Sequence, residues 1–216
     1  QMRKFRLCIL DWNGTLQDDL HHIYECGVQR IFRHFGLRCP TLEEYRHEVA
    51  ADFMASFYWP RGIPRGVTAK DLNAIMAEGF KEKGTPAGVF PDALATVEAL
   101  HGRGYPLVLA SGYDSGKLAV AVDRNGFRRF FPRVVGDVLD KPAVFARLIA
   151  EAGAAGDTVA VIGDTVEDVL GAAAVGATPF ICPRGFHPLE RIEATRAAAP
   201  KLIIVDSLEE LLTRLP

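Results

Sequence analysis

A run of apolar residues near the start of the chain ends abruptly in an acidic residue. The run extends from Phe5 to Leu10, is broken only by Arg6, and is followed by Asp11 and Gly14. This pattern predicts a buried strand that leads into a tight loop. A carboxylate at the carboxyl end of a buried strand lies where open α/β sheets bind their ligands, although Asp also opens ordinary turns. The patterns in the rest of the chain are needed to tell whether Asp11 binds a ligand or only opens a turn.

The segment that follows has the pattern of helices and lacks the alternation typical of strands. Apolar residues recur at helical spacing after Leu20, and Thr41 with Glu44 forms the pattern of a capping box. We therefore expect an inserted helical domain over residues 17–88. Its predicted helices span residues 20–35, 42–51 and 69–83, with a loop or short helix over the aromatic, proline-rich residues 53–64.

From Val89 onward, apolar strand patterns alternate with helical ones, which favours a mostly parallel sheet covered by helices on both faces. The predicted strands span residues 106–110, 134–135, 159–162, 178–182 and 202–205. The predicted helices span residues 93–103, 116–124, 142–152, 165–175 and 208–215, the last with a capping box formed by Ser207 and Glu210.

Composition narrows the class of protein further. The chain has 216 residues and a formal net charge of −2, which gives no reason to expect a nucleic-acid or membrane partner. No apolar run is long enough to span a bilayer, and the start has no signal-peptide pattern. The four cysteines form no C-x-x-C pair, so we expect a reducing, cytoplasmic compartment. They are Cys8, Cys26, Cys39 and Cys182.

Polar residues follow four of the predicted strands, at the point where each strand ends. They are Asp11, Ser111 with Gly112, Lys141, and Asp164. Each has an ordinary explanation, because Ser111 could be a turn residue, Lys141 a solvated charge, and Asp164 the cap of the next helix. However, the carboxyl ends of parallel strands open onto one rim of a sheet. The four clusters together therefore predict a functional site at that rim.

These clusters resemble the four motifs of the haloacid dehalogenase superfamily. The segment from Asp11 to Leu16, D-W-N-G-T-L, resembles its first motif, D-x-D-G-T-L. Ser111 matches the second motif, Lys141 with Pro142 the third, and residues 163–168, G-D-T-V-E-D, the fourth. The overall pattern is most similar to small phosphatases of the phosphoglycolate phosphatase type. The resemblance implies a Rossmann-like three-layer α/β core formed by residues 1–16 and 89–216, with a helical cap domain formed by residues 17–88.

The resemblance also implies roles for individual residues. Asp11 would be the nucleophile that accepts a phosphoryl group as an aspartyl-phosphate, and Lys141 would keep it ionised. Thr15 would position the loop and help to bind substrate. The phosphoryl oxygens would be bound by Ser111, the backbone amide of Gly112, and Lys141. The implied ligands of Mg²⁺ are Asp11, the backbone carbonyl of Asn13, Asp164 and Asp168. The implied catalytic set is Asp11, Asn13, Ser111 and Lys141.

Asn13 departs from the motif, because phosphatases of this superfamily usually have a second aspartate there as the general acid and base. An amide cannot exchange a proton in this way, and such catalysis is worth about 10²–10⁴-fold. Three explanations stay open. Asp18 or Asp19 substitutes as the acid, although either could instead cap the following helix; the substrate has a good leaving group; or the protein transfers or binds phosphate compounds without efficient turnover. A dehalogenase fits less well, since attack on carbon needs no metal and both acidic residues of the fourth motif are present. Phosphonatases, like dehalogenases, carry another residue at the position of Asn13.

The expected function is therefore Mg²⁺-dependent hydrolysis of a small phosphorylated metabolite, by a monomer or homodimer, with unusual turnover because of Asn13. The alternatives are a binding or regulatory protein, and a phosphotransferase or other non-phosphatase of the superfamily. The cap should determine specificity. Its candidate substrate contacts are Tyr58, Trp59, Arg61 and Arg65, although the aromatic residues could equally form the cap core and the arginines face solvent.

Overall fold

The structure is a computed structural model that describes residues 5–215. The first four residues and residue 216, which the predicted core domain includes, lie outside the described residues. The chain divides into two compact units. One contains the described residues up to Asp18 together with those from Val89 onward, and the other contains Asp19–Gly88. The first unit is called the core and the second the helical unit.

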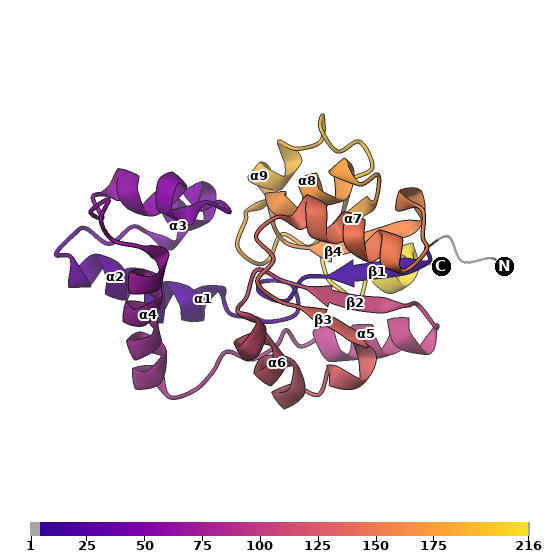
Figure 1. The fold of residues 1–216 in the computed structure, drawn as a ribbon, viewed down its shortest axis with the longest axis horizontal. Helices are drawn as coiled ribbons and strands as arrows, with labels where there is room; N and C mark the ends of the chain where they lie inside the picture. Colours follow the sequence, from indigo (N-terminus) through magenta and orange to yellow (C-terminus); the bar gives the residue numbers. More distant parts are fainter. Residues whose placement is uncertain (1–4, 216) are drawn as a thin grey trace. The chain divides into compact units, whose positions relative to one another are not determined.

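The core is built on a parallel sheet, which confirms the predicted α/β fold class (Figure 1). In the described part of the chain the sheet has six strands in the order β3-β2-β1-β4-β5-β6, and every neighbouring pair is parallel. The strands are β1 (Leu7–Leu10), β2 (Leu107–Ala110), β3 (Arg133–Val135), β4 (Val159–Gly163), β5 (Thr178–Ile181) and β6 (Ile203–Ile204). Strand β1 therefore lies inside the sheet, between β2 and β4.

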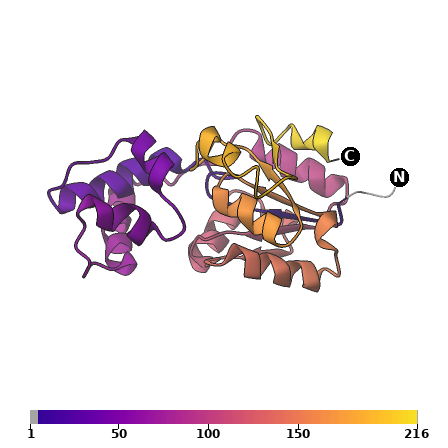
Figure 2. The ribbon, with the colours of Figure 1, turned by 90° about the horizontal axis from the view of Figure 1, so that it is seen from above.

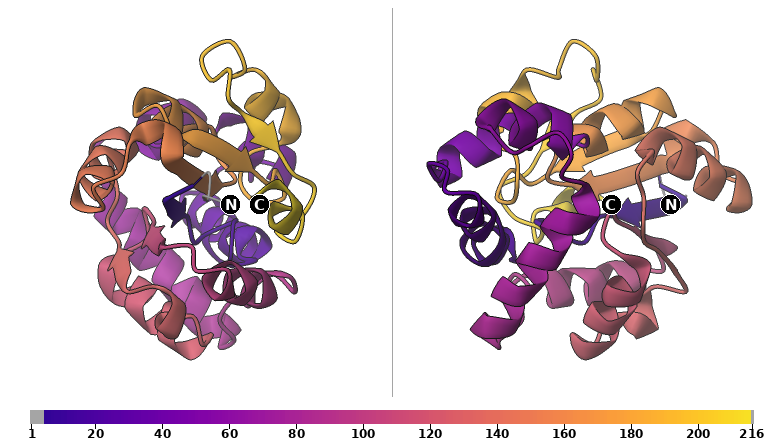
Figure 3. Two further views of the ribbon diagram at one scale, coloured as in Figure 1. Left: turned by 90° about the vertical axis from the view of Figure 1, so that its right-hand side faces the viewer. Right: turned by 60° about the vertical axis from the view of Figure 1, so that its left-hand side comes forward.

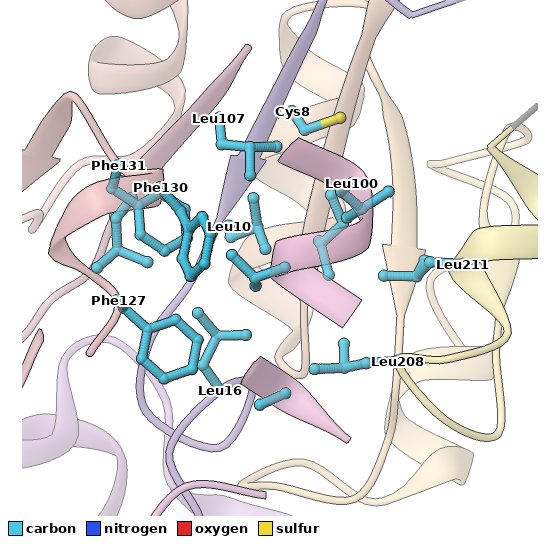
Figure 4. Packing of buried hydrophobic residues seen from close by; sticks show 14 of the residues in the cluster. Cys8, Leu10, Leu16, Leu100, Leu107, Phe127, Phe130, Phe131, Leu208 and Leu211 are labelled. Carbon is cyan, nitrogen blue, oxygen red and sulfur yellow. The ribbon is translucent and has the colours of Figure 1, made fainter. Parts of the chain in front are cut away.

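Strand β1 is completely buried because helices cover both faces of the sheet (Figures 1 and 3). Cys8 and Leu10 pack on one face, and Leu7 and Ile9 on the other, as the alternation of side chains along a strand requires. Figure 4 shows Leu10 among residues of the first face, with Leu100 and Leu211 from the helices that cover it. That face is covered by α5 (Ala93–Gly102), α6 (Ser115–Arg124) and α10 (Leu211–Arg214), and the other by α7 (Lys141–Glu151) and α8 (Val166–Ala174).

The helical unit contains no strand within residues 19–88, all of which the structure describes (Figure 2). Its elements are α1 (Leu20–Ile23), η1 (Tyr24–Val28), α2 (Gln29–His34), α3 (Leu42–Glu48), η2 (Met54–Tyr58), η3 (Trp59–Arg61) and α4 (Ala69–Lys83). Thr41 and Thr68 each form a complete capping box, at the starts of α3 and α4. The unit has its own apolar centre, in which Phe57 packs edge-on against Phe32.

One helical prediction in the core was wrong, and one helix was not predicted. The last helix was expected to begin at residue 208 with a capping box, but α10 begins at Leu211. Only half of the capping box forms: the Ser207 hydroxyl accepts from the backbone amide of Glu210 over 3.3 Å, but the Glu210 carboxylate accepts from the amide of Asp206 and not from that of Ser207. Residues 206–210 therefore form bends and turns before the helix. The helix α9 (Leu189–Glu193) was missed because it is short. Among residues 5–215, no helix has the length and apolar character needed to cross a membrane.

Candidate active site

Asp11 comes directly after β1, at the carboxyl edge of the sheet, where it was expected. Its backbone amide continues the ladder by donating to the carbonyl of Ile162 over 2.9 Å. Its Oδ1 accepts a hydrogen bond from the backbone amide of Trp12 over 2.6 Å. The residue is only 7% exposed. The backbone around Asp11 is thus fixed by β4, and its carboxylate is held by its own loop.

Lys141 is a largely buried partner of two carboxylates and not the solvated charge considered above. It is the first residue of α7, whose start is fixed by Asp140, because the Asp140 side chain accepts from the amide of Ala143 over 3.0 Å. Its Nζ atom lies 2.9 Å from Oδ2 of Asp11 and 2.6 Å from Oδ1 of Asp168. Its side chain is 11% exposed. Lys141 of the third motif therefore contacts Asp11 of the first motif and Asp168 of the fourth.

Asp168 both orients a helix and faces the site. Thr165 is the N-cap of α8 and forms a reciprocal capping box with Asp168, so Asp164 is not the cap of this helix. The Oδ2 atom of Asp168 accepts from the amide and the hydroxyl of Thr165, over 3.1 and 2.6 Å. Its Oδ1 is left facing Lys141. The capping box therefore fixes the orientation of this carboxylate.

Asp164 is fully buried and is held from two loops that are distant in sequence. Its Oδ1 accepts from the hydroxyl of Thr15 over 3.0 Å, and its Oδ2 accepts from the backbone amide of Phe186 over 2.6 Å. The loops approach so closely that a Cβ atom at Gly14 or Gly185 would lie 2.3 or 2.1 Å from Oδ2 of Asp164. Gly14 also has a φ of +69°, which favours glycine. Glycine at these two positions allows Asp164 to reach the site.

The three carboxylates form a group suited to a divalent cation. Ligand oxygens of Asp11, Asp164 and Asp168 lie within 4.8 Å of one another, and all three residues are buried. Burial raises the pKa of Asp11 and of Asp164, although Lys141 opposes the shift at Asp11. Burial would lower the pKa of Lys141, but its two carboxylate neighbours outweigh burial and raise it, so Lys141 stays protonated. One ammonium cannot neutralise three buried carboxylates, and hard divalent cations prefer such oxygen ligands.

The second motif lies beside the first, as expected. Ser111 is buried after β2, and its backbone amide donates to the carbonyl of Val135 over 2.9 Å. Its hydroxyl donates to Oδ1 of Asn13 over 3.3 Å. Gly112 follows on the exposed surface of the same loop. The structure therefore brings Ser111 to Asn13, and Asp11 to Lys141, Asp164 and Asp168.

The two aspartates proposed as substitute acids differ in burial. Asp18 is exposed, whereas Asp19 is 3% exposed and begins the helical unit. Asp19 occupies the N-cap position of α1, but its side chain makes no capping hydrogen bond. Simple capping therefore does not explain the burial of this carboxylate.

The structure adds contacts that the motifs do not indicate. Gln17 is buried, and its Oε1 atom accepts from Nε1 of Trp12 over 2.8 Å. Arg184, in the loop after β5, pairs with Asp92 at 2.9 Å and donates to the carbonyl of Thr15 over 3.2 Å. The guanidinium carbon also lies 3.8 Å from the ring centroid of Phe90. Gly185, which follows the predicted strand 178–182, indicates a loop at this position. Nothing in the sequence identifies the partners of Arg184 in that loop.

The candidate substrate contacts of the helical unit have structural partners within that unit. Tyr58 is 4% exposed and stacks on Phe32, with 5.9 Å between ring centroids. Arg61 forms an ion pair with Glu48 and lies over the ring of Phe57, 4.4 Å from its centroid. Arg65 is exposed, and its guanidinium carbon lies 5.4 Å from the ring centroid of Trp59. Tyr58 and Arg61 therefore stabilise the unit, and Arg65 has the greatest access to solvent.

The fold and the site together define a class of enzyme with a strand-end aspartate, a buried lysine and two further carboxylates at the rim of a parallel sheet. A family model described as haloacid dehalogenase-like hydrolase matches residues 5–176. The chain belongs to this family, which confirms the predicted superfamily and the prediction of a hydrolase.

Individual relatives agree with the family assignment. The chain is 27% identical over 193 residues to a 5'-nucleotidase of Pseudomonas aeruginosa, with 86% of each chain covered. It is 24% identical over 204 residues to a phosphoglycolate phosphatase of Aliivibrio fischeri, with 87% of this chain and 88% of the relative covered. Among solved structures, it matches a predicted phosphoglycolate phosphatase from Haemophilus somnus with a TM-score of 0.78 at 17% identity, covering 100% of both chains. This last likeness confirms the fold.

Proposed function

We propose that the protein is a phosphatase that hydrolyses a small phosphorylated metabolite through an aspartyl-phosphate on Asp11. The observation that carries this proposal is the position of Lys141, whose Nζ contacts both Asp11 and Asp168 in a buried site. Such a site can receive an anionic phosphoryl group and stabilise the charge that spreads over its oxygens. The names of the relatives, a 5'-nucleotidase and phosphoglycolate phosphatases, support the same substrate class.

In the proposed reaction Asp11 attacks phosphorus, and the leaving oxygen departs with the bonding electron pair. Lys141, Ser111 and the amide of Gly112 bind the phosphoryl oxygens. Water then forms a bond to phosphorus while the bond to Asp11 breaks, so that inorganic phosphate is released, Asp11 regains its electron pair as a carboxylate, and the proton of the water passes to solvent. Dividing hydrolysis into two displacements replaces one difficult step by two easier ones.

We include Mg²⁺ in the proposal. Asp11, Asp164, Asp168 and the backbone carbonyl of Asn13 would hold it, and the mutual proximity of the three buried carboxylates supports this assignment. When bound, the cation would offset repulsion between the carboxylates and the anionic substrate. Thr15 would act through Asp164, to which its hydroxyl donates.

The remaining parts of the proposal concern the domains and the setting of the enzyme. Residues 17–88 would form a cap that determines specificity, with the core formed by the rest of the chain. A cytoplasmic location is supported by the four cysteines, all of which are unpaired thiols. The partner would be a small-molecule phosphate ester, and the enzyme would act as a monomer or homodimer.

Asn13 supports a second candidate, a protein that binds phosphate compounds without efficient turnover. The chain lacks the usual acid at this position, whereas Asp11, Lys141, Asp164 and Asp168 form a complete nucleophile and metal group. A pure binding protein has no need for that group. A dehalogenase is disfavoured for the same reason, since attack on carbon needs no metal.

The test is Mg²⁺-dependent phosphate release across a panel of phosphometabolites. We expect release by the wild type and none by Asp11→Asn, which keeps the shape of the side chain but removes the nucleophile. Calorimetry with Mg²⁺ and beryllofluoride provides a second measurement, because an aspartyl-phosphate enzyme should bind the mimic only when Asp11 is present. Silence of the wild type in both assays would contradict the phosphatase proposal, and mimic binding without release would favour the second candidate.

A further inference from the structure

The side chain of Gln17 has an orientation that its neighbour Trp12 determines. Trp12 is fully buried, and its indole N–H can only donate. It donates to Oε1 of Gln17 over 2.8 Å. If Gln17 turned its amide around, Nε2 would face the indole N–H and two donors would oppose each other. The oxygen of Gln17 is therefore held towards Trp12.

The same oxygen sets the orientation of Asn13. The Nδ2 atom of Asn13 donates to Oε1 of Gln17 over 3.4 Å, and Oδ1 of Asn13 accepts from the hydroxyl of Ser111 over 3.3 Å. The backbone reinforces this arrangement, because Gln17 donates to the carbonyl of Trp12 over 2.8 Å and accepts from Gly14 over 2.9 Å. Residues 12–17 thus form a loop closed by backbone hydrogen bonds, and the side-chain amide of Asn13 links this loop to Ser111.

A carboxylate at position 13 would not fit this arrangement. It would place an acceptor against Oε1 of Gln17, which cannot turn without losing its bond from Trp12. The carboxyl would have to stay protonated and donate to Gln17, or turn away from it. In either case it would be misdirected as the general acid and base of a phosphatase. The hydrogen bonds around position 13 therefore suit the amide of an asparagine, and they do not suit the carboxylate of an aspartate.

We propose, resting on the phosphatase function above, that Gln17 is a positioning residue that fixes the orientation of the Asn13 side chain and leaves no place there for a working carboxyl acid. The enzyme then acts on phosphate compounds whose leaving group departs without a proton. The chemical class comprises acyl phosphates and phosphoanhydrides, which replace the phosphate ester proposed above because an alkyl ester would release an alkoxide. A bond forms between Asp11 and phosphorus while the bond to the leaving oxygen breaks, and that oxygen leaves as a stable carboxylate or phosphate anion with the electron pair. In the second step water forms the new bond to phosphorus, Asp11 regains its electron pair, and the proton passes to solvent water.

The experiment measures kcat/KM with Mg²⁺ for acetyl phosphate, 4-nitrophenyl phosphate and ethyl phosphate. The first two release stable anions, whereas ethyl phosphate must release an alkoxide or have it protonated. General acid catalysis is worth about 10²–10⁴-fold. The preference is the ratio of kcat/KM for 4-nitrophenyl phosphate to kcat/KM for ethyl phosphate. We expect this ratio to be about 10²–10⁴-fold larger for the wild type than for an enzyme with a working general acid.

Variants test the role of Gln17. Asn13→Asp alone should change this preference by less than about tenfold, because its carboxyl is held by Gln17. Asn13→Asp combined with Gln17→Met should reduce the preference by about 10²–10⁴-fold, because the carboxyl is freed to act as an acid. A merely structural role of Gln17 would alter all substrates equally. Asn13→Asp with Trp12→Phe is the second combination, since it removes the indole donor and lets Gln17 turn. Gln29→Met, the same change in the helical unit, is the matched control.

The outcomes separate this inference from the proposed function. If the wild type hydrolyses ethyl phosphate as readily as 4-nitrophenyl phosphate, an acid is present and the inference is wrong, while the phosphatase proposal stands. If Asn13→Asp alone reduces the preference as much as the combined variants do, Gln17 has no positioning role. The wild-type series decides the substrate class even if a variant does not fold. If the wild type hydrolyses ethyl phosphate but neither acetyl phosphate nor 4-nitrophenyl phosphate, the inference is wrong; if it hydrolyses none of the three, the inference fails, and the phosphatase proposal is decided separately by the metabolite panel and by beryllofluoride binding.

Discussion

The Nζ atom of Lys141 lies 2.6 Å from Oδ1 of Asp168, and both side chains are shielded from solvent. Replacing Lys141 by methionine would leave buried carboxylates without their cation. Removing one partner of a buried ion pair typically costs about 3–5 kcal/mol. We expect Lys141→Met to lower the free energy of unfolding by about that amount in metal-free buffer at pH 7, measured by urea denaturation. It should also reduce kcat/KM by at least about 10²-fold.

The matched control for this prediction is Lys117→Met, at an exposed position in α6. It should change the free energy of unfolding by no more than about 0.5 kcal/mol. Equal effects of the two substitutions would show that Lys141 makes no special contribution.

Mg²⁺ should stabilise the protein through the group formed by Asp11, Asp164 and Asp168. A ligand at 100 times its dissociation constant stabilises by about 2.7 kcal/mol. Protons compete with the cation for Asp11 and Asp164, because burial raises the pKa of both carboxyls. Calorimetry should therefore show tighter Mg²⁺ binding at pH 8 than at pH 6. Asp164→Asn should abolish binding, whereas Asp157→Asn, at an exposed position, should not. Binding that is independent of both pH and Asp164 would place the cation elsewhere.

Gly185 should tolerate no side chain. A Cβ atom there would lie 2.1 Å from Oδ2 of Asp164 and 2.5 Å from the carbonyl oxygen of Gly14. We expect Gly185→Ala to destabilise the protein by about 1–3 kcal/mol, which urea denaturation measures. It should also weaken Mg²⁺ binding, because Asp164 is displaced. Gly102→Ala, where nothing lies within 4 Å, serves as the control and should be neutral or slightly stabilising. Similar losses in both variants would indicate that the close approach is unimportant.

Glu44 should make the stability of the helical unit depend on pH in the acidic range. Arg38 and the backbone amide of Thr41 lower the pKa of Glu44 to about 2. Since the folded value lies below the unfolded value of 4.5, the unfolded state binds more protons between these values. The contribution to stability is complete above about pH 4.5 and is lost as the pH falls towards 2. An NMR titration should show the low pKa, and it should rise towards the ordinary value in Arg38→Met. Glu43→Gln is the control, and should leave the titration of Glu44 unchanged.

The sequence was sufficient to predict the parts of the fold that depend on local patterns. The capping box at Thr41 was predicted correctly because it requires only residues within one turn. The polar residues at strand ends were also predicted to converge, since parallel strands place their carboxyl ends at one rim. Asp11, Lys141 and Asp168 meet there.

Contacts that depend on tertiary structure could not be predicted in this way. Arg184 reaches Thr15 and Asp92 across more than ninety residues of chain, and no local pattern indicates either partner. The amide of Phe186 binds Asp164 through its backbone, for which the residue type gives no signal. At the end of the chain, Ser207 and Glu210 have the spacing of a capping box, but only half of it forms: the Ser207 hydroxyl accepts from the amide of Glu210, whereas the Glu210 carboxylate accepts from the amide of Asp206. Spacing alone does not choose between these two partners.

The interior position of β1 has a consequence for hydrogen exchange. A strand with neighbours on both sides and helices over both faces exchanges its amides only when the whole core unfolds. The amide of Asp11 belongs to this ladder through its bond to Ile162. It should therefore exchange as slowly as the centre of the sheet. The backbone of the proposed nucleophile should thus keep its register in the sheet until the core itself unfolds.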